Sequence, residues 1–319
     1  MKFFAKAICD RAQIENRKSW DADGIELYLR GTPLWDESTR DLLNFASDNF
    51  KQVNLEIGDR ISQEPLIPAD LLGLFTVNYI RAALETLRKL PNGGKLIVHL
   101  AAHCEPIIEP PYLDFLNQAE TRGGTLQLAL EQVERLDPKR ERILLENIIV
   151  LDWMDEETGK IATPPIGYVT QDFGTWPRVV DLAHHGITAH VLARAEPNPD
   201  TNGTAYYSSE KFGRIPFHFG PAEEQLAKIT KSTPRGAVTL EIVESFPYLQ
   251  EVHVSVNSGL LDGYGFDAPD PYFSLERVLR IFSGMDELVF VPELREETGD
   301  YVAAAQNHEM FRELKAMFR

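Results

Sequence analysis

The sequence predicts an α/β fold, a closed (β/α)8 TIM barrel formed by a single domain over residues 1–319. Short apolar or β-branched runs alternate with segments of helical periodicity, which is the pattern of a parallel sheet. Eight such runs are present, and eight strands close this kind of barrel. The 319 residues exceed the roughly 250 of a typical barrel, so we expect a long insertion, placed after strand six. An open doubly wound sheet is the alternative fold.

The predicted strands are short runs of aliphatic and β-branched residues, as expected for strands buried on both faces. They cover residues 3–8, 24–29, 53–57, 95–100, 143–150, 178–183, 251–256 and 287–291. Residues 237–244 are ambiguous between a strand and a helix. We favour the helix, because a ninth strand would break the alternation.

The predicted helices carry apolar residues at intervals of three and four. One covers residues 69–90 and ends at the turn-forming residues 91–94, and a second covers 125–136. Ser274 is the expected N-cap of a helix that runs to Phe282, and a last helix covers 301–318. The helix between strands five and six is poorly marked.

The surplus of chain lies at about residues 186–250. It contains a turn cluster at 196–203, followed by aromatic residues. The aromatic residues are Tyr206, Tyr207, Phe212, Phe217 and Phe219. Because the segment follows a strand, it should emerge at the face of the barrel where the loops build sites. A lid over the site and a surface insertion or dimer contact are equally consistent with this placement.

Composition excludes several classes of partner. There are 32 basic and 49 acidic residues, a net charge of −17, which repels phosphate backbones and makes nucleic acid an unexpected partner. The two cysteines, Cys9 and Cys104, fit a reducing compartment. No signal-peptide pattern and no apolar run of roughly 18 residues is present, so we expect a cytoplasmic protein with no membrane partner.

Polar residues near the ends of four otherwise apolar strands are the informative anomaly, since a buried carboxylate needs a partner or a metal. They are Glu146 with Asn147, Asp181, His253 and Glu293. The carboxyl ends of the strands meet at one mouth of a barrel, which would bring three carboxylates and an imidazole together. Such a mixed oxygen and nitrogen set suits Mn²⁺, Mg²⁺, Co²⁺ or Zn²⁺.

The ordered set of Leu-Glu146-Asn147, Asp181-x-x-His184, Val-His253-Val-Ser and Glu293 resembles the xylose isomerase-like barrels. That superfamily contains sugar isomerases, ketose 3-epimerases, inosose dehydratases and apurinic endonucleases. The Gly-Ile-Glu26-Leu and Leu-Ile-Val-His99 runs also resemble its second and fourth strands.

The resemblance implies that Glu146, Asp181, His253 and Glu293 bind one divalent metal, and that Glu146 and Glu293 also move a proton on a sugar or polyol substrate. It implies that His184 contacts substrate or a second metal. We add His99 and Arg295 as candidate substrate contacts, although a salt bridge is an alternative role for Arg295.

The sequence departs from the endonucleases of that superfamily. Strand three, which reads Leu-Glu56-Ile-Gly-Asp59, lacks the zinc-binding His that they have there, and Tyr264 stands where they have a second one. We therefore expect a sugar or polyol isomerase or epimerase. The alternatives are a hydrolase or lyase on the same site, including a phosphodiesterase, and a non-catalytic barrel that keeps the ligands. A homodimer is the default assembly.

Overall fold

The structure is a computed structural model that describes most of the 319-residue chain. The described residues are 1–58, 60–62, 67–100, 119–149, 153–154, 161–163, 173–192, 194, 196–197, 204–209, 213–218, 246–259, 261–268, 273–296 and 300–318. The ambiguous segment 237–244 lies outside them.

Eight parallel strands close into a barrel in the order β1-β17-β14-β10-β7-β6-β3-β2. They are β1 (Lys2–Ile8), β2 (Gly24–Tyr28), β3 (Val53–Ile57), β6 (Gly93–His99), β7 (Ile143–Glu146), β10 (Arg178–Asp181), β14 (Leu249–Val254) and β17 (Val289–Pro292). The predicted (β/α)8 barrel is thereby confirmed, strand for strand. Five predicted ends were too late. The fifth strand stops at Glu146 rather than 150, and the sixth stops at Asp181 because a helix begins at the next residue. The seventh stops at Val254, two residues early, and the second and fourth stop one residue early.

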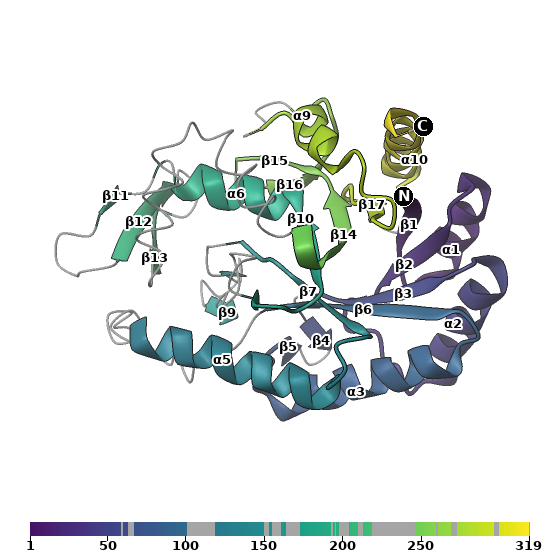
Figure 1. Cartoon of the computed structure of the whole chain (residues 1–319), viewed down its shortest axis with the longest axis horizontal. Coiled ribbons are helices and arrows are strands. Elements are labelled where there is room, and N and C mark those ends of the chain that lie inside the picture. Colours follow the sequence, from purple (N-terminus) through teal and green to yellow (C-terminus); the bar gives the residue numbers. More distant parts are fainter. Residues whose placement is uncertain are drawn as a thin grey trace.

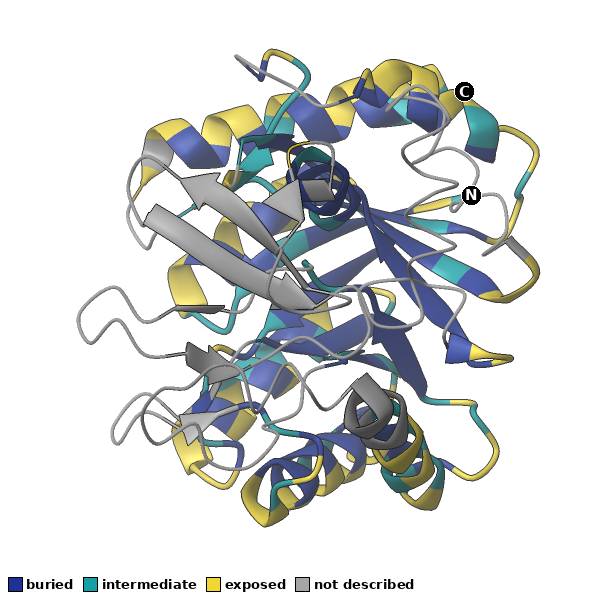
Figure 2. Cartoon of the chain, turned by 90° about the vertical axis from the view of Figure 1, so that its left-hand side faces the viewer, coloured by how far each residue is buried: buried dark blue, intermediate teal, exposed yellow. Residues whose placement is uncertain are grey.

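Helices cover the outside of the barrel, as Figure 1 shows for α3 and α5 beneath β6 and β7. The longer ones are α2 (Glu37–Asn49), α3 (Leu74–Lys89), α5 (Ala119–Leu136), α6 (Leu182–Leu192) and α10 (Tyr301–Met317). Helix α9 (Leu275–Leu279) begins after Ser274 as predicted, and a 3-10 turn (Arg280–Phe282) extends it. Leu43, Ile80 and Leu87 are buried on the inward faces of α2 and α3. Figure 2 shows the same division, with buried strands inside and exposed outer helix faces.

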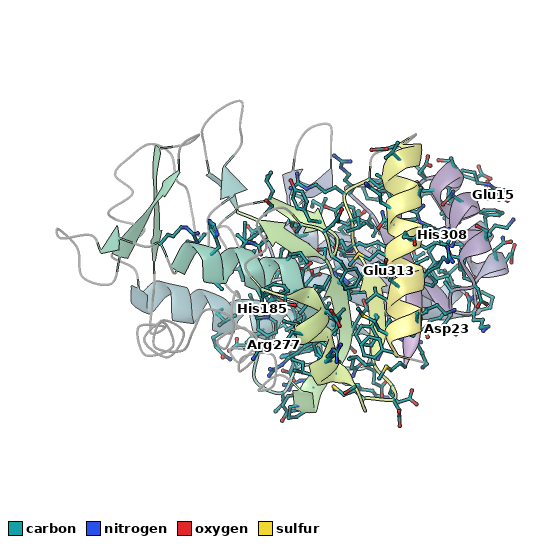
Figure 3. All side chains as sticks on the ribbon, turned by 90° about the horizontal axis from the view of Figure 1, so that it is seen from above. Glu15, Asp23, His185, Arg277, His308 and Glu313 are labelled. Atoms are coloured by element: carbon teal, nitrogen blue, oxygen red, sulfur yellow. The ribbon has the colours of Figure 1, made fainter. Side chains whose placement is uncertain are left out.

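The first and last strands pair and close the barrel, and aromatic packing stabilises this seam. Phe3 of β1 stacks on Phe290 of β17 with ring centroids 5.7 Å apart, and Phe290 stacks on Phe318 at 4.7 Å. His308 of α10, labelled in Figure 3, stacks on Trp20 at 5.0 Å. Each such pair contributes about 1 kcal/mol beyond the apolar area that it buries. The C-terminal helix is therefore packed on the N-terminal strand.

The segment after strand six begins as the regular helix α6 of this βα unit. A three-stranded antiparallel sheet follows, formed by β11 (Glu196–Pro197), β12 (Thr204–Ser209) and β13 (Gly213–His218). In Figure 1 it lies beside the C-terminal end of α6. The function of residues 186–250 stays a prediction. Within the described residues, no helix has the length and apolar composition needed to cross a membrane.

Candidate metal centre

Four strands deliver the predicted ligand residues to one end of the barrel. Glu146 and Asp181 are the last residues of β7 and β10, His253 lies next to the end of β14, and Glu293 follows β17 directly. The register pairs Asp181 with His253 on neighbouring strands. One donor atom from each of the four lies within 4.8 Å of the others. The structure thus brings together the whole set that the sequence singled out.

His253 is the centre of this group, and its two ring nitrogens face different partners. Nδ1 lies 3.2 Å from Glu146 Oε1 and 3.0 Å from Glu293 Oε2. Nε2 lies 3.1 Å from Glu26 Oε1 and 3.3 Å from Glu251 Oε1. The hydrogen bond between Nε2 and Glu251 Oε1, with the carboxylate of Glu26 beside it, places the proton on Nε2, fixes the ring orientation and directs the Nδ1 lone pair at the four-residue group. Glu26 and Glu251 therefore position His253.

Asn147 ties the ends of β7 and β10 together beneath the group. Its side-chain oxygen accepts from Asp181 N (2.8 Å) and its amide donates to Asp181 O (3.1 Å). Its backbone oxygen lies 2.8 Å from Nδ1 of His184. A carbonyl only accepts, so this contact places a proton of His184 on Nδ1, and in the neutral ring Nε2 is then the unprotonated nitrogen that carries the lone pair.

The predicted substrate contacts lie around the same group. His99 ends β6, and its Nε2 is 3.1 Å from Glu146 Oε2. His184 sits in the first turn of α6, with Nδ1 3.8 Å from Glu146 Oε1. Arg295 lies farther out, is 62% exposed in its side chain, and donates to Asp262 from Nε and Nη2 at 3.0 and 2.8 Å. The alternative expectation for Arg295, a salt bridge, is therefore what the structure shows.

The side chains on the first three strands extend the polar interior and were not assigned to the site from the sequence. Lys6 of β1 contacts Glu293 Oε1 at 2.5 Å, Glu26 Oε1 at 3.3 Å, and Glu56. Glu26 and Glu56 are both buried, as expected for residues inside a barrel. The signal for Lys6 was its place in the apolar run Phe-Phe-Ala-Lys6-Ala-Ile, since an unpaired ammonium would not be buried there.

Burial and neighbouring charges shift the pKa values in this interior. Burial raises the pKa of Asp181 to about 6, with the carboxylates of Glu293 and Glu146 adding to it against His184. Burial also raises the pKa of Glu56 to about 8, although Lys6 opposes it. Burial would raise the pKa of Glu293 as well, but the charges of Lys6 and His253 outweigh it and hold that pKa at about 2. For Glu146 the same balance against His253 and His99 leaves the pKa well below its ordinary value.

A hairpin after β14 forms one side of the mouth. It consists of β15 (Val256–Ser258) and β16 (Leu261–Tyr264). Gly263 adopts φ +75°, a conformation that favours glycine, and its carbonyl accepts from Arg295 N at 3.2 Å. This turn places Asp262 Oδ2 3.9 Å from His184 Nε2. No pattern in the sequence indicated that contact.

No protein-family model and no curated protein sequence matches this chain. Solved structures of the same fold do match. A D-tagatose 3-epimerase-like protein matches with a TM-score of 0.57 and 13% identity over 100% of this chain and 98% of the other. A D-allulose 3-epimerase from Methylomonas sp. matches with a TM-score of 0.56 and 12% identity over 99% and 98%. A Thermus thermophilus protein, described as soaked with ZnCl₂, matches with a TM-score of 0.51 and 15% identity over 100% of both chains. These likenesses establish the shared fold.

Proposed function

We propose that this chain is a divalent-metal-dependent isomerase or epimerase that acts on a sugar or polyol. The observation that carries the proposal is the convergence of Glu146, Asp181, His253 and Glu293 at the carboxyl ends of four successive barrel strands. The fold agrees with it, since two of the matching structures are described as a ketose 3-epimerase and an epimerase-like protein.

The donor atoms fit a divalent ion. His253 Nδ1 and Glu293 Oε2 are both buried without a hydrogen-bond partner, although they lie 3.0 Å apart. Two buried acceptors that face each other are costly unless a proton or a cation lies between them. Three carboxylates and one imidazole are a donor set for Mn²⁺, Mg²⁺, Co²⁺ or Zn²⁺. We therefore assign Glu146, Asp181, His253 and Glu293 as the ligands.

A bound ion would polarise the carbonyl and hydroxyl oxygens of a sugar and so acidify the neighbouring C–H bond. Glu146 and Glu293 are the two carboxylates placed to move that proton: one removes it from carbon and the other returns it, so that the configuration changes while the composition does not. His184 and His99 border the group from the mouth and would hold substrate hydroxyls. Arg295, farther out, would contact the distal part of the substrate.

The proposal is tested by metal content and by exchange of carbon-bound hydrogen. Purified protein should contain about one divalent ion per chain, bound by the group of Glu146, Asp181, His253 and Glu293. Incubation with ketohexoses, ketopentoses and cyclitols in D₂O should place deuterium at the epimerised carbon, observed by NMR. Glu293→Gln should abolish that incorporation. A protein that binds no divalent ion in elemental analysis and titration would contradict the proposal. Metal binding without turnover would favour the non-catalytic barrel.

One observation favours a second candidate, a metal-dependent hydrolase or lyase. His99, Glu146 and His184 form another group whose donor atoms lie within 4.8 Å of one another, and it shares Glu146 with the first. Two ions that share a carboxylate are typical of phosphoester chemistry. About two ions per chain, with salt-sensitive binding to abasic DNA, would support this alternative. About one ion and no such binding would support the isomerase or epimerase.

A further inference from the structure

Lys6 is a cation fixed inside the barrel beside the proposed ligand group. It lies in the middle of β1, opposite Glu26 on β2, and its side chain is only 11% exposed. Its ammonium contacts three carboxylates, one from β2, one from β3 and one that follows β17, namely Glu26, Glu56 and Glu293. None of the contacts proposed for substrate or metal uses this side chain.

Glu146 and Glu293, the two carboxylates proposed to move the proton, each direct their two oxygens to different partners. Glu293 directs Oε2 to His253 Nδ1 at 3.0 Å and Oε1 to Lys6 Nζ at 2.5 Å. Glu146 directs Oε1 to His253 Nδ1 at 3.2 Å and Oε2 to His99 Nε2 at 3.1 Å. Each carboxylate therefore turns one oxygen to the ligand group and the other to a nitrogen of its own. The difference is that Glu293 has an ammonium as its partner, while Glu146 has an imidazole.

We propose that Lys6 is a positioning residue that occupies Glu293 Oε1, so that this carboxylate offers a single oxygen to the metal and keeps the orientation needed for proton transfer. The inference rests on the proposed function and deepens it. A carboxylate with one oxygen in ion-pair contact with an ammonium at 2.5 Å cannot turn both oxygens onto an ion without breaking that contact. Lys6 thus fixes the orientation of the Glu293 carboxylate and does not contact the substrate itself.

The contact between Lys6 and Glu293 also predicts in which direction the metal affinity changes when Lys6 is replaced. An ammonium in contact with a ligand carboxylate repels an incoming divalent ion and withdraws charge from that ligand. Removing the ammonium should therefore strengthen metal binding, while proton transfer by a loosened Glu293 becomes slower. A residue that only supports the fold would behave differently, because its loss would weaken metal binding and activity together.

The test compares Lys6→Met with Lys2→Met, since Lys2 lies on the same strand but is exposed and pairs at the surface with Glu287. Metal-free proteins are titrated with MnCl₂ alone by calorimetry. We expect Lys6→Met to bind Mn²⁺ about tenfold more tightly than the wild type and Lys2→Met to match the wild type. Lys6→Arg keeps the charge and should stay close to the wild type. In the D₂O assay Lys6→Met should lose about tenfold in exchange rate, and Lys6→Arg should recover part of it.

The outcomes separate the two proposals. If the wild type binds no Mn²⁺, the proposed function fails. If the wild type binds Mn²⁺ and Lys6→Met binds it equally well or more weakly, the assignment of Lys6 fails while the proposed function stands. Should Lys6→Met not fold, Lys6→Gln provides the same comparison, because it also removes the charge while its amide can still donate to Glu293. Tighter Mn²⁺ binding in that variant supports the assignment, and unchanged or weaker binding overturns it.

Discussion

The two halves of the barrel interior solve one electrostatic problem in different ways. The half formed by β1, β2 and β3 contributes Lys6, Glu26 and Glu56, so the ammonium of Lys6 is the countercharge of the two carboxylates. The half formed by β7, β10, β14 and β17 contributes the carboxylates of Glu146, Asp181, Glu251 and Glu293 and the imidazole of His253, and none of these four strands contains a lysine. A buried carboxylate needs a countercharge. The first half carries its own countercharge, and we propose that the second takes a divalent ion from solution.

Two of the proposed ligands contact both halves, and this makes the halves depend on each other. His253 presents Nδ1 to the ligand group and Nε2 to Glu26, and Glu293 presents Oε2 to the ligand group and Oε1 to Lys6. A change on β1 or β2 should therefore reach the metal through these two side chains. Substitutions confined to either half test how far the comparison holds.

The largest effect is expected from Asp181→Asn in the half that contains the proposed ligands. Among the described residues no ion pair joins Asp181 to Lys6, Glu26 or Glu56, so its loss removes a charged donor and leaves the first half intact. Loss of a supporting contact alone typically costs about 10- to 100-fold in metal affinity, so the Mn²⁺ dissociation constant should rise by about 100-fold or more. Calorimetric titration measures it. Glu287→Gln, at a 90% exposed side chain, is the control and should bind like the wild type.

A smaller effect is expected from Glu26→Gln in the other half. The amide oxygen can still accept from His253 Nε2, but the charge that orients the ring and increases its basicity is lost. We expect Mn²⁺ binding about tenfold weaker than in the wild type, measured in the same titration. Unchanged binding would show that Glu251 alone orients His253, since it lies 3.3 Å from the same nitrogen.

The third effect is on the pH dependence of stability in the metal-free protein, and it tests the half formed by β1, β2 and β3 alone. The pKa of Glu56 is raised from 4.5 to about 8, first by burial and then by neighbouring carboxylates, against the opposing charge of Lys6. A carboxyl whose pKa is higher in the folded state stabilises the fold fully below the unfolded value, and this stability is lost as pH rises from about 4.5 through 8. Glu56→Gln should flatten that decline, so its melting temperature should fall less than that of the wild type between pH 5 and pH 8. An equal decline in both proteins, measured by circular dichroism in EDTA, contradicts the prediction.

The eight strands were predictable because a parallel barrel buries both faces of each strand, which leaves continuous aliphatic runs in the sequence. The same background made Glu146, Asp181 and His253 conspicuous as polar residues at the ends of apolar runs. Lys6 is equally conspicuous within its run, but its three acidic partners lie on other strands and only closure of the barrel brings them together. Periodicity along one strand indicates which residues of that strand lie on the same face. It does not indicate which residues of other strands they contact.

The mouth was less predictable because turns set its contacts. The approach of Asp262 to His184 depends on the positive φ of Gly263 in a hairpin that no periodicity marks. The link from Arg295 to Asp262 depends on the same hairpin. The predicted role of Arg295 at the substrate therefore needs its own test, since the salt bridge alone accounts for its position.

The smallest effect is expected from Arg295→Ala, outside both halves. Its ion pair with Asp262 is largely exposed, and such pairs contribute about 0–1 kcal/mol, so the melting temperature and Mn²⁺ affinity should stay close to the wild type. If Arg295 contacts the distal part of the substrate, KM should rise about fivefold while kcat stays nearly constant, because uniform binding is lost. Asp262→Asn is the matched variant: it breaks the same ion pair but keeps the guanidinium, so its KM should change less. Equal KM values for Arg295→Ala and the wild type would leave the salt bridge as the only role of this side chain.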